Sequence, residues 1–106
     1  MAKYMFSASY TLDGVRGLVR EGGSARRAAV EKAIGGLGGS IEAFYYTFGD
    51  DDVIVIADAP DNVTAAGVSL AIAASGAVTI KTTVLLTPED IDAATKVQVG
   101  YRAPGA

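Results

Sequence analysis

Apolar and polar positions alternate strictly at the start of the chain. Between residues 3 and 11 the side chains of Tyr4, Phe6 and Tyr10 fall on one side, and Met5 and hydroxyl residues fall on the other. A period of two that is rich in aromatic residues predicts a β-strand over this segment.

Three more segments have the composition of strands. One is an aromatic run, one is β-branched, and one precedes a Thr-Pro-Glu-Asp sequence; the predicted strands are residues 40–48, 52–59 and 78–86. The middle one is apolar at every position from Val53 to Ala57, which is typical of a strand covered on both faces. Gly49 and the aspartates after it predict the turn before this strand.

Helical spacing marks two longer segments. Apolar residues recur every three or four positions over residues 25–37, and Ser24 is the expected N-cap. A second helix is predicted up to Gly76, with Asp61 or Asn62 as its cap. The predicted apolar side of this second helix consists of Val63, Ala66, Leu70, Ala73 and Ala74.

Two shorter helices complete the pattern. The first follows Asp13, which is its expected cap, and is interrupted by Gly22 and Gly23. The second begins at Thr87-Pro88-Glu89-Asp90 and extends to Val97. A capping threonine, a proline in the first turn and acids at the positive end of the dipole all favour this start.

The glycine-rich run at residues 35–39 has the composition of a phosphate-binding loop but the wrong position. Such a loop precedes a helix, whereas this one follows a predicted helix. The run therefore predicts a helix C-cap with a left-handed exit.

The predicted order is βαββαβ with an added C-terminal helix. This is the α+β, ferredoxin-like arrangement, in which helices cover one face of a four-stranded antiparallel sheet. The other face must meet solvent or a partner, and either alternation of residues 40–48 would give it bulky apolar groups. We therefore expect sheet-to-sheet pairing into a dimeric α+β barrel, with a single domain over residues 1–98 and a tail at residues 99–106.

Composition supports self-association. Half of the 106 residues are hydrophobic and the mean hydropathy is +0.31. This is high for a small domain, since a chain of roughly 100 residues buries only about two-thirds of its unfolded surface. The uncharged stretch from Val63 to Ile80 is poor in large apolar residues and is interrupted by Gly76, so we interpret it as a buried helix and a strand start rather than a membrane span. The first residues do not have the pattern of a signal peptide, and we expect a cytoplasmic protein.

The residue inventory excludes several classes of chemistry. The chain has no His, Cys or Trp, so zinc fingers, thiol nucleophiles and His-based triads are excluded, and no cofactor is expected. The net charge of −3 and the pI near 4.7 argue against nucleic acid as a partner. Basic residues concentrate between Arg16 and Lys32 and none occurs over residues 33–80, an asymmetry that could steer self-association.

Tyrosines are the best candidates for contacting a small molecule, because each combines apolar area with a polar tip. The expected pocket residues are Tyr4, Tyr10, Tyr45 and Tyr46. The expected residues of an oligomer interface are Phe44, Phe48, Leu70, Tyr101 and Arg102. The carboxylates of residues 50–52 could bind a hard cation, but they lack the spacing of calcium loops, and turn solvation is the favoured interpretation.

The hairpin of residues 43–61, with its Gly-Asp-Asp-Asp turn and Ala-Pro-Asp ending, resembles the signature of the GYD-domain family. The opening strand with Asp13-Gly14 and the helix start at Thr87 are also similar, as is the Tyr101-Arg102 tail of some members. The family's name comes from a Gly-x-Tyr-Asp hairpin; here Asp51 stands where the tyrosine would be. The resemblance implies a dimeric α+β-barrel type of fold and no particular activity.

Two function classes follow. The first is a non-catalytic homo-oligomeric building block or small-ligand-binding module. The second is a small cofactor-free enzyme of the monooxygenase or isomerase type, which rests on analogy of fold alone. In that case Tyr45 or Tyr46, together with Asp58, would have to carry the chemistry.

Overall fold

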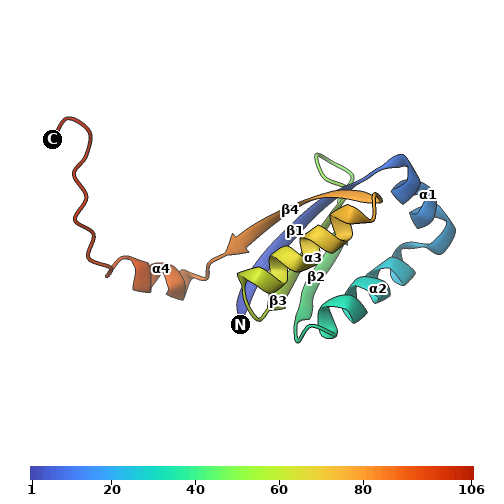
Figure 1. The fold of residues 1–106 in the computed structure, drawn as a ribbon, viewed down its shortest axis with the longest axis horizontal. Helices are drawn as coiled ribbons and strands as arrows, with labels where there is room; N and C mark the ends of the chain where they lie inside the picture. The colour runs from blue at the N-terminus through green and yellow to red at the C-terminus, as the bar shows by residue number, and fades with distance from the viewer.

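The computed structural model describes residues 1–106 and consists of a four-stranded antiparallel sheet with helices over one face (Figure 1). The strand order is β2-β3-β1-β4, so the predicted ferredoxin-like α+β topology is confirmed. The elements are β1 (Ala2–Tyr10), α1 (Leu12–Glu21), α2 (Gly23–Gly35), β2 (Ser40–Tyr46), β3 (Val53–Ala59), α3 (Asn62–Ala74), β4 (Val78–Leu85) and α4 (Pro88–Ala94).

The caps of the first two helices differ from the prediction. Thr11, not Asp13, caps α1, because its hydroxyl accepts the Gly14 N–H at 3.3 Å. Ser24 does not cap α2, because Gly22 ends α1 with a φ of 85° and the chain enters α2 at once, with Gly22 as the N-cap.

The other predicted ends are confirmed. The glycine run terminates α2 and leaves it through Gly38, whose φ of 82° is in the left-handed region. Thr87 and Asp90 form a reciprocal capping box at the start of α4, with Pro88 in its first turn. That helix ends at Ala94 rather than at Val97.

The core lies between the helices and the two central strands, β1 and β3. Its floor is the helix-facing side of these strands, and the buried side chains include Phe6, Val53, Val55 and Ala57. Tyr4 is almost fully buried, and its hydroxyl donates to Oδ1 of Asn62 at 2.5 Å. The Asn62 side chain thus contacts Tyr4, and the N-cap of α3 is Asp61, whose carboxylate accepts the Thr64 N–H at 2.8 Å.

A β-bulge decides which side of β2 faces the helices. The pairing with β3 shifts between Ile41 and Ala43, so Ile41 shares a side with Phe44 and Tyr46. These three pack on the core, while Ala43 and Tyr45 turn to the opposite face. The aromatic run thus divides between the two faces of the sheet.

Helix α3 presents a different side to the core from the one predicted. Ala65, Val68 and Ile72 pack inward, whereas Val63 and Leu70 are 81% and 71% exposed. The helix is apolar all round, so its periodicity does not distinguish one side from the other.

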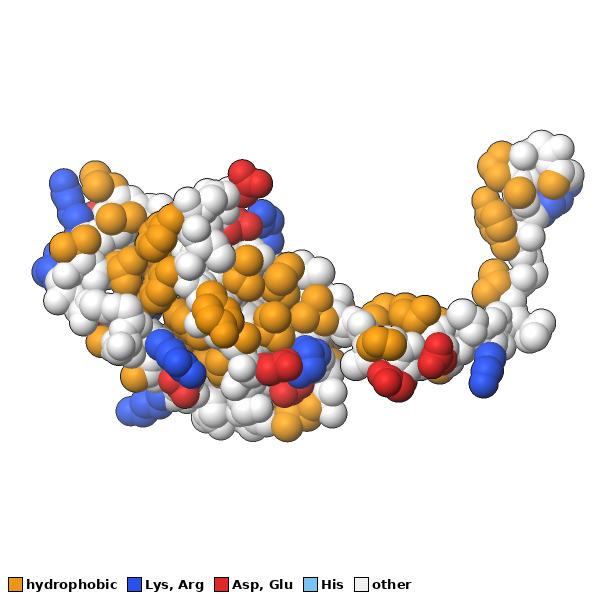
Figure 2. Space-filling model, turned by 180° about the vertical axis from the view of Figure 1, so that it is seen from behind, with side chains coloured by type: hydrophobic (Ala, Val, Ile, Leu, Met, Phe, Trp, Pro, Cys, Tyr) orange, Lys and Arg blue, Asp and Glu red, His pale blue; other side chains and the backbone are white.

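The opposite face of the sheet has no helix over it. We call this surface the open face; its residues, by strand, are Lys3, Met5, Ser7 and Ser9; Ala43 and Tyr45; Ile54, Ile56 and Asp58; Thr79, Lys81, Thr83 and Leu85. Its centre is apolar, and charged groups lie toward its margins (Figure 2). Lys3 pairs there with Asp58 at 3.0 Å, and Lys81 pairs with Asp51 at 3.1 Å.

Residues 86–106, which we call the arm, extend away from the body formed by the sheet and α1 to α3 (Figure 1). The molecule is consequently elongated, with extents of 58 × 32 × 22 Å. The predicted domain of residues 1–98 thus includes α4, which lies apart from the sheet and from the other helices (Figure 1). None of the helices has the length and apolar character needed to cross a membrane.

One close approach joins α1 to the turn between α3 and β4. A Cβ on Gly14 would lie 2.0 Å from the carbonyl oxygen of Ala77. That oxygen accepts the Thr11 N–H at 2.9 Å and the Thr11 hydroxyl at 3.2 Å, so it is not free to move. Only glycine allows α1 to start this close to β4.

We expect Gly14→Ala to lower the free energy of unfolding by about 1–3 kcal/mol, because the added methyl group must displace a backbone carbonyl. Urea denaturation measures this change. Gly17→Ala, in the same helix with nothing within 4 Å of its Cβ, is the control and should stabilise the protein by ~0.5–1 kcal/mol. Equal effects from the two substitutions would contradict the close-packing account.

Candidate functional site

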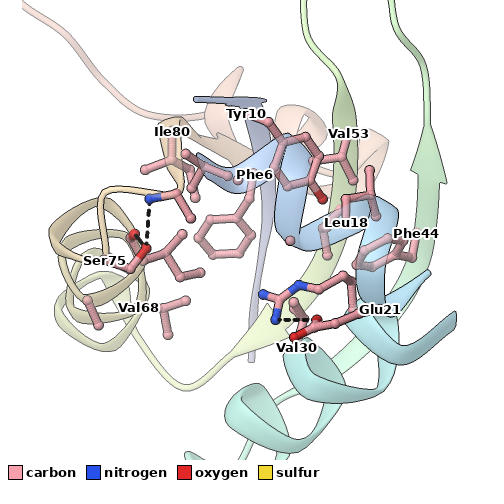
Figure 3. A pocket seen from close by; sticks show the side chains of 18 of the residues that line it. Phe6, Tyr10, Leu18, Glu21, Val30, Phe44, Val53, Val68, Ser75 and Ile80 are labelled. Atoms are coloured by element: carbon pink, nitrogen blue, oxygen red, sulfur yellow. Dashed lines mark hydrogen bonds and ion pairs between the residues drawn. The ribbon is translucent and has the colours of Figure 1, made fainter. Parts of the chain in front are cut away.

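A cavity of about 480 Å³ lies between the helices and the sheet. Phe6, Tyr10 and Val53 line it from the strands, Leu18 and Val30 from α1 and α2, and Val68 from α3 (Figure 3). Of the 20 lining residues, 14 are hydrophobic. Its volume lies within the roughly 300–1,000 Å³ range of small-molecule sites, and its lining is of the same kind.

The cavity exists because the helix layer is divided. Helix α2 packs on β2, and α3 packs mainly on β4, at the two sides of the sheet. The side chains that α3 turns toward the gap are short or medium, such as Val68, Ala71 and Ile72. Val30 and Ile34 of α2 line the cavity from the other side.

Four polar side chains contribute to the cavity wall together with Tyr10. They are Asp13, Glu21, Arg26 and Ser75. Arg26 forms an ion pair with Glu21 at 3.4 Å, while the Asp13 carboxylate has no cationic partner. The wall therefore carries one more negative than positive group, which disfavours an anionic ligand.

Tyr10 supplies a half-buried hydroxyl to this apolar space. Burial, followed by the neighbouring Tyr46 hydroxyl, raises the pKa of Tyr10 to about 12. The phenol therefore stays protonated at neutral pH and can donate a hydrogen bond, but it is a poor base. Its backbone is held from the hairpin turn, since the Tyr10 N–H donates to the Asp52 carboxylate at 2.8 Å.

The four tyrosines predicted to line a pocket are distributed over different environments. Only Tyr10 lines the cavity. Tyr46 lies beside it on β2 and donates its hydroxyl to the Gly23 carbonyl at 3.2 Å. Tyr4 belongs to the closed part of the core, and Tyr45 is 69% exposed on the open face.

The residues predicted for an oligomer interface are similarly dispersed. Phe44 lines the cavity and is not available on the open face. Phe48 is exposed at the β2–β3 turn, where it stacks on Tyr46. Leu70 is exposed on the outside of α3, and Tyr101 and Arg102 are exposed in the arm.

The acidic turn holds the sheet together rather than gathering its carboxylates around one point. Asp52 accepts from the Tyr10 backbone, and Asp51 pairs with Lys81 of β4. No group of three acidic side chains in the molecule is arranged to hold a metal ion.

The residues of the enzymatic hypothesis do not converge. Tyr46 faces the helices, whereas Asp58 lies on the open face beside Lys3. Tyr45 shares the open face with Asp58 but pairs with Ile54, four residues along β3, or about 13 Å away at the rise of a strand. Neither tyrosine can act together with this carboxylate at one reacting atom.

Most of the cavity residues carried no sequence signal of a site. Phe6, Val30 and Val53 stand at ordinary core positions, and the apolar pattern predicts burial without predicting a gap. The sequence signal for the cavity is the number of short side chains in α3, because an Ala-rich helix fills poorly the space between itself and its neighbour.

The raised pKa of Tyr10 makes a prediction for alkaline titration. Unfolding returns this phenol to its ordinary value near 10, so stability present below pH 10 is lost as the pH rises toward 12. One of the five tyrosines should ionise late in tyrosinate absorbance, and Tyr10→Phe should remove that phase and the associated loss of stability. Tyr101→Phe is the control and should keep the late phase; its loss there would contradict the assignment.

No curated protein and no solved structure matched the chain. The family model described as GYD domain matches residues 4–95, which include β1 from Tyr4 onward, the other three strands, all four helices and the residues that line the cavity. The match confirms the resemblance carried by the hairpin and by the Thr87 helix start. The chain therefore belongs to the GYD-domain family.

Proposed function

We propose that this protein is a non-catalytic module that binds a small, uncharged apolar molecule in the cavity between its helices and its sheet, and that it works as a homodimer or a larger homo-oligomer. The cavity carries this proposal, since a mostly apolar hollow of about 480 Å³ that opens to solvent has the size and lining of a small-molecule site. A cytoplasmic location remains a prediction from the sequence.

The character of the walls supports this ligand class. The lining is mostly hydrophobic, so an apolar body gains by leaving water. Arg26 is already paired with Glu21, and Asp13 adds a second negative charge, which disfavours an acid. The protonated Tyr10 hydroxyl can donate one orienting hydrogen bond to a carbonyl, ether or hydroxyl oxygen of the ligand.

The open face supports association with a second copy. Met5, Ile54, Ile56, Ala43 and Tyr45 present an apolar centre without any covering helix. Charges of both signs flank this centre, at the Lys3–Asp58 pair and at the Lys81–Asp51 pair. Two copies related by a twofold axis could bury the apolar centres against each other and leave the charges at the rim.

Ligand binding is tested with the neutral fluorescent probe N-phenyl-1-naphthylamine. We expect saturable binding, and Val68→Phe should weaken it by about tenfold or more, because the larger ring occupies the cavity. Val30→Phe, from the opposite wall, should act in the same way.

Val63→Phe makes a comparable change on the outside of α3, where the side chain is 81% exposed, and should leave probe binding unchanged. Circular dichroism checks that each variant is folded. Failure of the wild-type protein to bind the probe, or equal binding by all variants, contradicts the cavity as the site.

Association is tested by sedimentation velocity. We expect a dimer or larger oligomer for the wild type, and monomers for Ile56→Asp and for the more exposed Tyr45→Asp, because each buries a charge in the proposed interface. Leu70→Asp, on the outside of α3, should remain associated. Dissociation by Leu70→Asp alone would move the interface to α3.

A further inference from the structure

The large apolar residues of the arm are not buried against the body. The arm begins where β4 ends and runs away from the sheet (Figure 1). Its large apolar side chains are between 48% and 74% exposed; they are Leu86, Ile91, Val97, Val99 and Tyr101. Such a segment is suited to a surface that its own body does not provide.

The helix of the arm needs a neighbour to persist. α4 has seven residues, whereas isolated helices shorter than about 12–15 residues are marginal in water. The Thr87–Asp90 capping box defines where the helix starts. It adds only about 1 kcal/mol, which does not replace tertiary packing.

After α4 the pattern changes from helical to alternating. Val97, Val99 and Tyr101 are separated by Gln98 and Gly100. A period of two with β-branched and aromatic residues is typical of a strand. An extended segment of this kind can add to the exposed edge of a sheet, with backbone hydrogen bonds supplying much of the affinity.

The body offers a suitable edge at β4. This strand pairs with β1 in unbroken register from Val78 to Leu85, and its other side has no strand beside it. The opposite edge, β2, is interrupted by the bulge between Ile41 and Ala43. Bulges make an edge a poorer template, so β4 is the better acceptor.

The size of the open face favours a second copy as the owner of that edge. A stable interface uses roughly 20–30 residues a side, which is more than the open face provides. The arm adds the missing surface and leaves the body directly beside that face, since Leu85 pairs with Lys3 at its margin. In its own chain the connection between β4 and α4 is only Leu86 and Thr87, and it directs the arm outward.

We propose that residues 97–101 of the arm lie along the free edge of β4 of a second copy, as a fifth strand of that copy's sheet. This inference rests on the proposed homodimer. A twofold axis makes the exchange reciprocal, so that each chain gives one strand and receives one. The arm then acts as a clasp around the sheet-to-sheet contact.

The full-length chain is suited to a disulfide test, because it has no native cysteine. Val99→Cys is mixed, after exchange of subunits, with a second chain carrying Thr79→Cys, Lys81→Cys or Thr83→Cys on β4. Disulfides require Cα atoms about 4.4–6.8 Å apart, so rapid oxidation reports neighbouring strands. Ala29→Cys, on the exposed side of α2, is the matched control.

We expect at least one β4 position to form mixed disulfide dimers with Val99→Cys well above the Ala29→Cys level. Disulfides that form only within a double-cysteine chain would show that the arm folds back on its own sheet, and would overturn the inference. The absence of any β4 disulfide above the control would overturn it too.

A second measurement separates the clasp from the dimer itself. In sedimentation experiments Val97→Asp with Val99→Asp should weaken association by about tenfold, less than Tyr45→Asp on the open face. A dimer that is unaffected by the arm substitutions overturns the clasp alone. A wild-type chain that is monomeric at micromolar concentration overturns both proposals.

Discussion

A four-stranded sheet with apolar side chains on both faces needs cover on both, and the body of this chain covers one. Val53 and Val55 of β3 point to the helices, and Ile54 and Ile56, between and beyond them, point to the open face. The continuous apolar run of β3 predicts a strand that is covered on both faces. Within the chain, the helices cover only one of these faces. The other side is the reason to expect a second copy, because burying apolar area is the main favourable term in association.

The face that the helices cover is also incompletely covered. Two helices share this face of the sheet, with α2 over β2 and α3 over β4. They leave a gap between them, and the α3 side chains that line it are short or medium in length. Gly14 holds the start of α1 against Ala77, and both residues line the cavity. The cavity thus results from the same constraint as the open face, since the sheet presents more apolar surface than the helices can reach.

The proposed ligand, dimer and clasp rest on different parts of the molecule. The cavity lies on the helix side of one body, the proposed dimer contact uses the opposite face, and the proposed clasp uses the β4 edge and the arm.

Local chemistry allowed the sequence by itself to determine the order of the elements, the exit from α2 at Gly38, the start of α4 at Thr87 and the apolar character of both faces of β3. Those features depend on backbone preferences and on period, which residues close in the chain decide. Three matters depended on the tertiary structure. The bulge of β2 assigned Phe44 and Tyr46 to the core and Tyr45 to the open face, α3 turned Val68 rather than Leu70 inward, and the core closed around Tyr4 but not beside Tyr10. In each case the alternatives were equally apolar along the chain, so only the fit between elements distant in sequence could choose between them.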